Sequence, residues 1–87
     1  LLLINLTLEQ AELLTDANLD SGKIYKLKVD AIPNGFIRVG GKTYGDEDTP
    51  KVMTKYVQAL DELIELGYVT HTSGQLYTMT SAAFDLF

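Results

Sequence analysis

The sequence predicts a single α+β domain spanning residues 1–87, in the order helix, β-hairpin, long helix, β-hairpin and short helix. Apolar residues recur at helical spacing over 8–17 and over 52–64, whereas apolar and polar residues alternate over 23–29. This change of period from 3.6 to 2 and back indicates helix, then strand, then helix. Apolar residues form 46% of the chain and charged residues 22%, which fits an ordinary globular domain and excludes a disordered or collagen-like chain.

The first helix is expected to begin at a capping box formed by Thr7 and Gln10. In this motif the N-cap side chain and the side chain three residues later each accept a hydrogen bond from the other residue's backbone N–H. Apolar residues then follow at helical spacing, at Leu8, Ala11, Leu14 and Ala17. The turn-rich segment 18–22 predicts that this helix ends near Asn18.

The first hairpin is predicted from the alternation over 23–29, a Pro-Asn-Gly turn at 33–35 and a returning strand over 36–39. The inward side is expected to hold Tyr25, Leu27, Val29, Ile37 and Val39. The outward side is expected to hold Ile24, Lys26, Lys28, Phe36 and Arg38. Residues 42–44 could continue either as a short third strand or as an irregular loop.

The second helix has the clearest pattern in the chain. Pro50 suits its first position after a cap at Asp48 or Thr49, and Gly67 is a natural stop. Its apolar stripe consists of Val52, Met53, Tyr56, Val57, Leu60, Leu63 and Ile64. This amphipathic pattern predicts that the helix packs along the centre of the core.

A second hairpin is predicted over 68–71 and 75–79, around a turn at 72–74. Its inward residues are expected to be Val69, Met79 and either Leu76 or Tyr77. Thr80 and Ser81 suit the cap of a last short helix over 82–87.

Residues 59–69 and 74–80 resemble the winged-helix signature, in which a long helix ends in a leucine, a glycine and two hydrophobic residues, and a two-stranded wing then leads to a threonine. More narrowly, the chain resembles a small winged-helix-like module found at the ends of longer bacterial and phage proteins. That module has a glycine-bounded hairpin, here Gly22-Lys23-Ile24 and Gly35-Phe36-Ile37, and a helix after a turn like Gly45-Asp46-Glu47-Asp48-Thr49-Pro50. The resemblance implies a winged-helix-like architecture whose second hairpin is the wing.

Residues 1–6 form an apolar segment that begins without Met or a basic flank. We therefore expect the chain to continue from a longer parent protein, without a secretory signal and in the cytoplasm. The longest apolar run is far shorter than the roughly 20 residues that span a bilayer. This run consists of Leu1, Leu2, Leu3 and Ile4, and it is the candidate segment for self-association. The alternative is that it packs on the core of its own chain.

The composition leaves little for catalysis. The chain has no cysteine and one histidine, and it contains no Ser–His–Asp arrangement, phosphate-binding loop or nucleotide fingerprint. The acidic segment 46–48 lacks the spacing of a calcium loop. We therefore expect a protein that is not an enzyme and has no metal, no cofactor and no evident small-molecule substrate.

Charge placement is the main indication of function. The net charge is −5, yet all seven basic residues lie between Lys23 and Lys55. A basic hairpin face could be a solvated surface that deters edge pairing, a contact for an acidic protein surface, or a platform for single-stranded nucleic acid. The candidate interaction surface is Ile24, Lys26, Lys28, Phe36 and Arg38.

The sequence thus predicts a non-catalytic accessory module that makes protein–protein contacts, with a partner or with a second copy of the chain. The alternative is a nucleic-acid-binding regulatory domain that uses the basic first hairpin and the start of the long helix. A hairpin stands where DNA-reading winged helices carry the first helix of their helix-turn-helix, and the net charge is negative, so this alternative is the weaker one.

Overall fold

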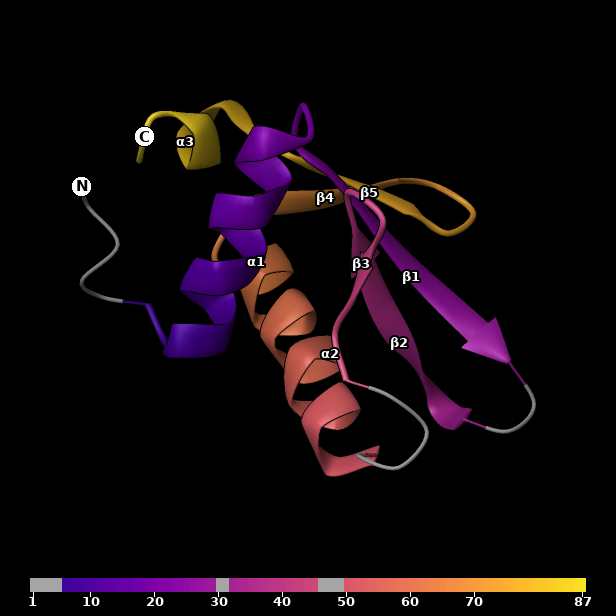
Figure 1. Ribbon diagram of the computed structural model, residues 1–87. Coiled ribbons are helices and arrows are strands. Elements are labelled where there is room, and N and C mark those ends of the chain that lie inside the picture. Colours follow the sequence, from indigo (N-terminus) through magenta and orange to yellow (C-terminus); the bar gives the residue numbers. More distant parts are fainter. Residues whose placement is uncertain (1–5, 30–31, 46–49) are drawn as a thin grey trace.

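The computed structural model describes residues 6–29, 32–45 and 50–87 (Figure 1). Its elements are α1 (Leu8–Leu19), β1 (Lys23–Val29), β2 (Ile32–Val39), β3 (Lys42–Thr43), α2 (Pro50–Glu65), β4 (Val69–Ser73), β5 (Leu76–Met79) and α3 (Ser81–Phe84). The predicted α+β class is confirmed. No helix in these three ranges has the length and apolar character needed to cross a membrane.

One antiparallel sheet of five strands contains both hairpins, in the order β3-β2-β1-β5-β4. The predicted winged-helix architecture is therefore wrong. Three strands, not a hairpin alone, separate α1 from α2, and the second hairpin is not a separate wing. It joins the first through β1–β5 pairing, in which Ile24 lies opposite Tyr77 and the Lys26 N–H donates to the Gln75 carbonyl at 2.9 Å. This pairing satisfies backbone groups that an isolated wing would leave to water.

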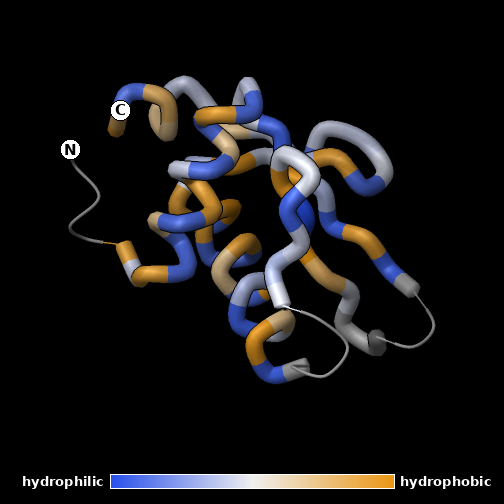
Figure 2. The backbone as a smooth tube through the Cα atoms, in the orientation of Figure 1, coloured by the Kyte–Doolittle hydropathy of each residue, from blue (hydrophilic) through white to orange (hydrophobic). Residues whose placement is uncertain are grey.

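The molecule has two layers, with α1 and α2 on the same side of the sheet (Figure 1). Hydrophobic residues recur along both helices and alternate with hydrophilic ones along β1 (Figure 2). The core lies between the layers, and its largest fully buried side chains are Leu13, Leu14, Ile24, Ile37, Val39, Leu60 and Leu63. We call the opposite side of the sheet, on which no described helix packs, the outer face.

Helix α1 begins as the sequence predicts. Thr7 is the N-cap, and both hydrogen bonds of the capping box with Gln10 are present. The Gln10 side chain is buried, and its Nε2 also donates to Glu62 Oε1 on α2 at 2.9 Å. The Gln10 amide thus caps the start of α1 and also links α1 to α2. Because the amide is hydrogen-bonded, it does not carry the cost of a buried, unpaired polar group.

The inward and outward sides of β1 are the reverse of those predicted. Tyr25 lies opposite Arg38 and Lys26 lies opposite Ile37, and residues opposite one another share a face. Because Ile37 is buried, Lys26 lies on the helix side, while Tyr25 lies on the outer face. The expected sides of β2, by contrast, are confirmed, since Ile37 and Val39 are buried and Arg38 is exposed. Its expected start is wrong, because β2 begins at Ile32 and the predicted turn at 33–35 belongs to the strand.

The physical reason for this reversal is the limited reach of the helical layer. On the helix side of β1, Ile24 is buried, Lys26 is half-buried and Lys28 is exposed. Burial thus falls along the strand, and the two lysines lie where they reach solvent past the helices. One inward isoleucine is sufficient to anchor the strand, so the more apolar side of β1 is left outside.

The remaining elements follow the predictions with small changes. Of the two alternatives for residues 42–44, the short strand is the correct one, since Lys42 and Thr43 form β3. In the second hairpin, Val69 and Met79 are buried as predicted, and Tyr77 rather than Leu76 packs against the core. The last helix, α3, is shorter than predicted. Thr80 before it donates through Oγ1 to the Gly67 carbonyl at 2.6 Å, which fastens α3 to the end of α2.

Candidate functional site

The outer face of the sheet carries a partly apolar surface. Tyr25 is 36% exposed, and Leu27, Phe36 and Leu76 beside it are half-buried. The strand register places them together, because Leu27 lies opposite Phe36, and Tyr25 lies between Arg38 on β2 and Leu76 on β5. We define the outer-face patch as Tyr25, Leu27, Phe36, Arg38 and Leu76.

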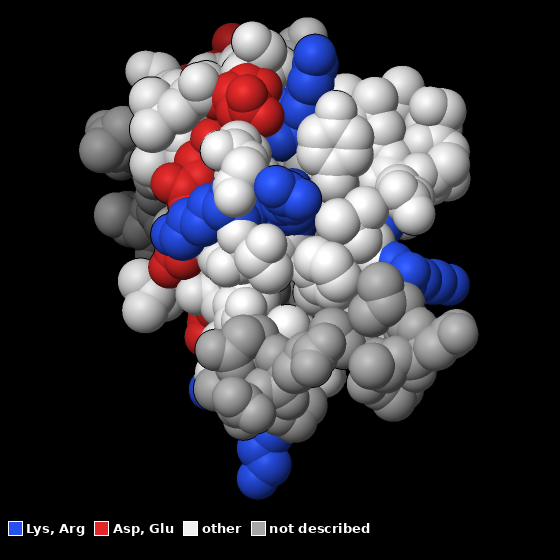
Figure 3. Space-filling model, turned by 45° about the vertical axis from the view of Figure 1, so that its right-hand side comes forward, with Lys and Arg blue, Asp and Glu red and all other residues white. Residues whose placement is uncertain are grey.

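The charges of the sheet and of α1 have opposite signs, whereas α2 contains both. The five strands contain Lys23, Lys26, Lys28, Arg38 and Lys42 and no acidic residue, whereas α1 contains Glu9, Glu12 and Asp16 and no basic residue. Figure 3 shows acidic side chains gathered along one side of the molecule, next to basic ones. The sheet is thus a basic surface on a chain whose net charge is −5.

The helix side of the sheet has a second basic feature beyond the helices. A surface hollow of about 260 Å³ is lined by Lys26, Lys28, Gly74, Gln75 and Tyr77. We call it the basic hollow. The ring of His71 lies 4.7 Å from that of Tyr77, and its Nε2 is 2.8 Å from the Gly74 carbonyl, to which it donates.

The candidate surface predicted from the sequence is therefore divided by the structure. Phe36 and Arg38 lie on the outer face, Lys26 and Lys28 line the basic hollow on the opposite side, and Ile24 is fully buried in the core. The expectation that these five residues share one exposed face is wrong. The candidate self-association residues Leu1, Leu2, Leu3 and Ile4 lie outside the described residues, as does the acidic segment 46–48.

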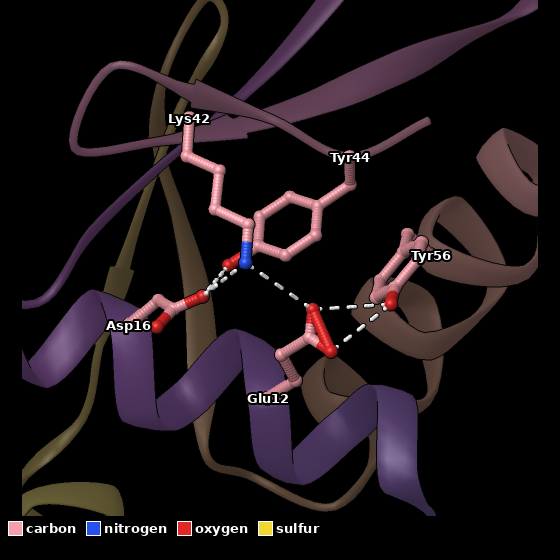
Figure 4. A network of polar contacts seen from close by, with 5 residues as sticks. All are labelled: Glu12, Asp16, Lys42, Tyr44 and Tyr56. Atoms are coloured by element: carbon pink, nitrogen blue, oxygen red, sulfur yellow. Dashed lines mark hydrogen bonds and ion pairs between the residues drawn. The ribbon is translucent and has the colours of Figure 1, made fainter. Parts of the chain in front are cut away.

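A third feature, missed by the sequence analysis, is a network of five polar side chains between α1, α2 and the segment after β2 (Figure 4). Tyr44 donates to Asp16 Oδ2, and Tyr56 donates to Glu12 at 3.1 Å. Lys42 Nζ lies 3.4 Å from Asp16 Oδ2 and 3.6 Å from Glu12 Oε2. Glu12 and Asp16 thus each have a tyrosine hydroxyl as a partner, and they share the ammonium of Lys42.

The network holds secondary-structure elements together. Tyr44 is 2% exposed, its ring centroid lies 4.6 Å from that of Tyr56, and Lys42 Nζ lies 4.8 Å from the centre of its ring. Glu12 and Asp16 are four residues apart, so they share one side of α1. That spacing is the only sign of the network in the sequence, because nothing local indicates which distant residues would meet them.

Both tyrosines of the network are held in their neutral form. Burial, the hydrogen bond to Asp16 and the charges of Asp16 and Glu12 raise the pKa of Tyr44 well above its ordinary value of 10.0. Burial and the hydrogen bond to Glu12 also raise the pKa of Tyr56. These hydroxyls therefore act as hydrogen-bond donors, and neither is suited to be a general base or a nucleophile near neutral pH.

The stability of the domain is expected to fall in alkali because of Tyr44. Above about pH 10 an unfolded tyrosine loses its proton while Tyr44 in the folded state keeps it, so the folded state binds more protons and loses about 1.4 kcal/mol per pH unit for this group. Tyr44→Phe removes this contribution. Urea unfolding at successive pH values should show the parent's advantage over this variant shrinking above about pH 10.

The matched control is Tyr25→Phe, which removes a tyrosine hydroxyl on the outer face, away from the network. A constant difference in unfolding free energy between parent and Tyr44→Phe across the alkaline range would contradict the raised pKa of Tyr44.

Within the described ranges, no group of three or more His, Cys, Asp or Glu side chains is placed to hold a metal ion. The hollow between the start of α1 and the middle of α2 is lined by Thr7, Glu9, Lys55, Gln58, Ala59 and Glu62, a mixed set without a nucleophile–base pair. The outer-face patch and the basic hollow are surface features of the sheet, one on each side of it. Comparison of the chain with protein-family models, with curated proteins and with solved structures finds no match.

Proposed function

We propose that this domain is a non-catalytic interaction module that contacts another protein through the outer-face patch. One observation supports this most directly: four partly exposed aromatic or aliphatic side chains lie together, next to Arg38, on a side of the sheet that no described helix covers. Tyrosine, phenylalanine and arginine are enriched at the centre of protein interfaces, where aromatic area and a planar charged group combine.

The partner is proposed to have an apolar centre with carboxylates opposite Arg38 and Lys23. Lys23 is exposed and, two residues before Tyr25 on β1, belongs to the same face. Because the strands contain no acidic residue, an acidic partner would meet complementary charge, which favours fast and specific association. Two copies packed face to face would instead bring like charges together, so a different protein is the preferred occupant.

Other parts of the sequence-based interpretation remain untested. The self-association of Leu1, Leu2, Leu3 and Ile4 stays a prediction, as do the cytoplasmic location and the attachment to a longer parent chain. The bacterial or phage setting, which depends only on the resemblance to that small module, also stays a prediction.

A second candidate function is binding of single-stranded nucleic acid on the same patch. Tyr25 and Phe36 lie on neighbouring strands as diagonal neighbours, beside Arg38, and such aromatic residues on a sheet can stack bases while a guanidinium contacts phosphate. The net charge of −5 opposes this candidate, because it repels the phosphate backbone over longer distances.

A peptide-display selection on the intact chain tests the proposal. Selected peptides are expected to combine aromatic or aliphatic residues with flanking Asp or Glu. Arg38→Glu and Tyr25→Ser should each weaken their binding at least about fivefold, measured by isothermal titration calorimetry. Lys51→Glu on α2, also exposed, has the same charge change as Arg38→Glu and should leave binding unaltered.

The nucleic-acid candidate is tested by fluorescence anisotropy with a labelled mixed-sequence single-stranded oligonucleotide at low and high salt. Binding that weakens steeply with salt and is lost in Arg38→Glu and Tyr25→Ser would replace the protein-contact proposal. The proposal is also wrong if no selected peptide depends on Tyr25 or Arg38.

A further inference from the structure

The basic hollow is a pocket of the sheet itself, on the side opposite the outer-face patch. It lies where β1 and β5 are neighbours, with Lys26 and Lys28 supplied by β1 and the other lining residues by the β4–β5 turn and β5. The Lys26 N–H donates to the Gln75 carbonyl at 2.9 Å, so the two sides of the hollow are joined by a backbone hydrogen bond. Its shape is therefore fixed by the sheet.

Its two lysines bring uncompensated positive charge together. They are two residues apart on the same side of one strand, which places their Cα atoms about 7 Å apart. In the described part of the chain, the ion pairs are those of Lys42 with Glu12 and Asp16, and the lining of the hollow includes no carboxylate. Lys26 is half-buried and Lys28 is exposed.

The rest of the lining supplies further hydrogen-bonding capacity. Gln75 has an amide that donates two hydrogen bonds, and Tyr77 supplies an aromatic wall. The ring centroid of His71 lies 4.7 Å from that of Tyr77, and His71 Nε2 donates to the Gly74 carbonyl at 2.8 Å. These contacts stabilise the β4–β5 turn, which forms one side of the hollow.

We infer that the basic hollow binds the dianionic group of a small phosphomonoester. A phosphomonoester near neutral pH carries close to two negative charges on three oxygens, so one group can accept hydrogen bonds from both ammoniums and the Gln75 amide. A carboxylate or sulfate ester carries one negative charge, so it compensates only one of the two positive charges of Lys26 and Lys28. The volume of about 260 Å³ suits a small ligand.

The experiment is an NMR titration of the intact chain with phenyl phosphate and, separately, with phenyl sulfate, at constant ionic strength and about pH 7.5. The two probes share the ring and the tetrahedral anion and differ in charge. Amide shifts are expected to saturate and to concentrate in β1 and in residues 74–77, with phenyl phosphate binding at least about threefold more tightly than phenyl sulfate.

Two variants test the lysines. Lys26→Gln and Lys28→Gln should each weaken phenyl phosphate at least about threefold, and Lys28 is exposed, so its replacement tests the inference even if the Lys26 variant folds poorly. Lys23→Gln is the matched control, with the same charge change on the same strand but on the outer face, and should bind like the parent.

The inference is overturned if phenyl phosphate and phenyl sulfate bind equally, if the shifts do not saturate, or if Lys28→Gln and Lys23→Gln weaken binding to the same extent. Each of those results would indicate only general attraction of anions to the basic sheet. The outer-face proposal is unaffected by them, because none of its residues lines the hollow.

Discussion

Replacing Leu60 by alanine is expected to lower the free energy of unfolding by about 2–5 kcal/mol. Leu60 is 0% exposed and belongs to the core cluster where α2 meets α1 and the sheet. Truncation removes buried methyl groups and leaves a cavity that the surrounding side chains fill only in part. Since small domains have about 5–15 kcal/mol of stability in total, the variant loses a large part of it.

Urea denaturation followed by circular dichroism measures this effect. The matched control is Leu66→Ala, the same truncation just after α2 at a side chain that is 54% exposed, which should change stability by less than about 0.5 kcal/mol. If Leu60→Ala unfolds at the urea concentration of the parent, the packing of α2 described above is incorrect.

Gly35→Ala is expected to cost about 2–4 kcal/mol, combining backbone strain with a clash. Gly35 has φ +76°, where a side chain is unfavourable, and an added Cβ would lie 2.5 Å from the Leu27 carbonyl oxygen on the adjacent strand. That oxygen is backbone and cannot turn away. Relief requires β1 and β2 to separate at the point where their register shifts, between Leu27 and Val29.

Gly41→Ala separates the two causes. Gly41 has φ +83°, but nothing lies within 4 Å of an added Cβ, so its replacement should cost only the backbone strain, about 1–2 kcal/mol. Thermal and urea unfolding of both variants give the comparison. Equal losses at the two positions would mean that the approach of β2 to β1 at Gly35 is not a tight contact.

Structural features that depend on residues within one helix could be predicted from the sequence. The capping box of Thr7 and Gln10 marks the start of α1, and the apolar stripe ending before Gly67 gives α2. Each depends on residues a few positions apart, so the backbone geometry that they favour is already defined locally. The second role of Gln10, its bond to Glu62, depends on how two helices pack and has no such local sign.

Properties set by distant packing could not be predicted. Both sides of β1 contain apolar residues, so alternation alone cannot decide which faces the core, and the choice depends on where α1 and α2 lie. Alternation along β1 places Lys26 and Lys28 on one side of the strand. Their separation from Phe36 and Arg38, and their meeting with Tyr77, follow from the β1–β5 pairing, which joins residues more than 50 positions apart.

The central place of β1 in the sheet also has a consequence for synthesis. Lys23 pairs with Thr78, so the strand at the middle of the sheet gains its second neighbour only after more than 50 further residues have been synthesised. During translation α1 and the first hairpin leave the ribosome early, yet one edge of β1 stays unpaired until β5 follows. Such an edge is a template for unwanted strand pairing, and closing a long loop to cover it is slow. Completion of the sheet thus waits for the synthesis of β5.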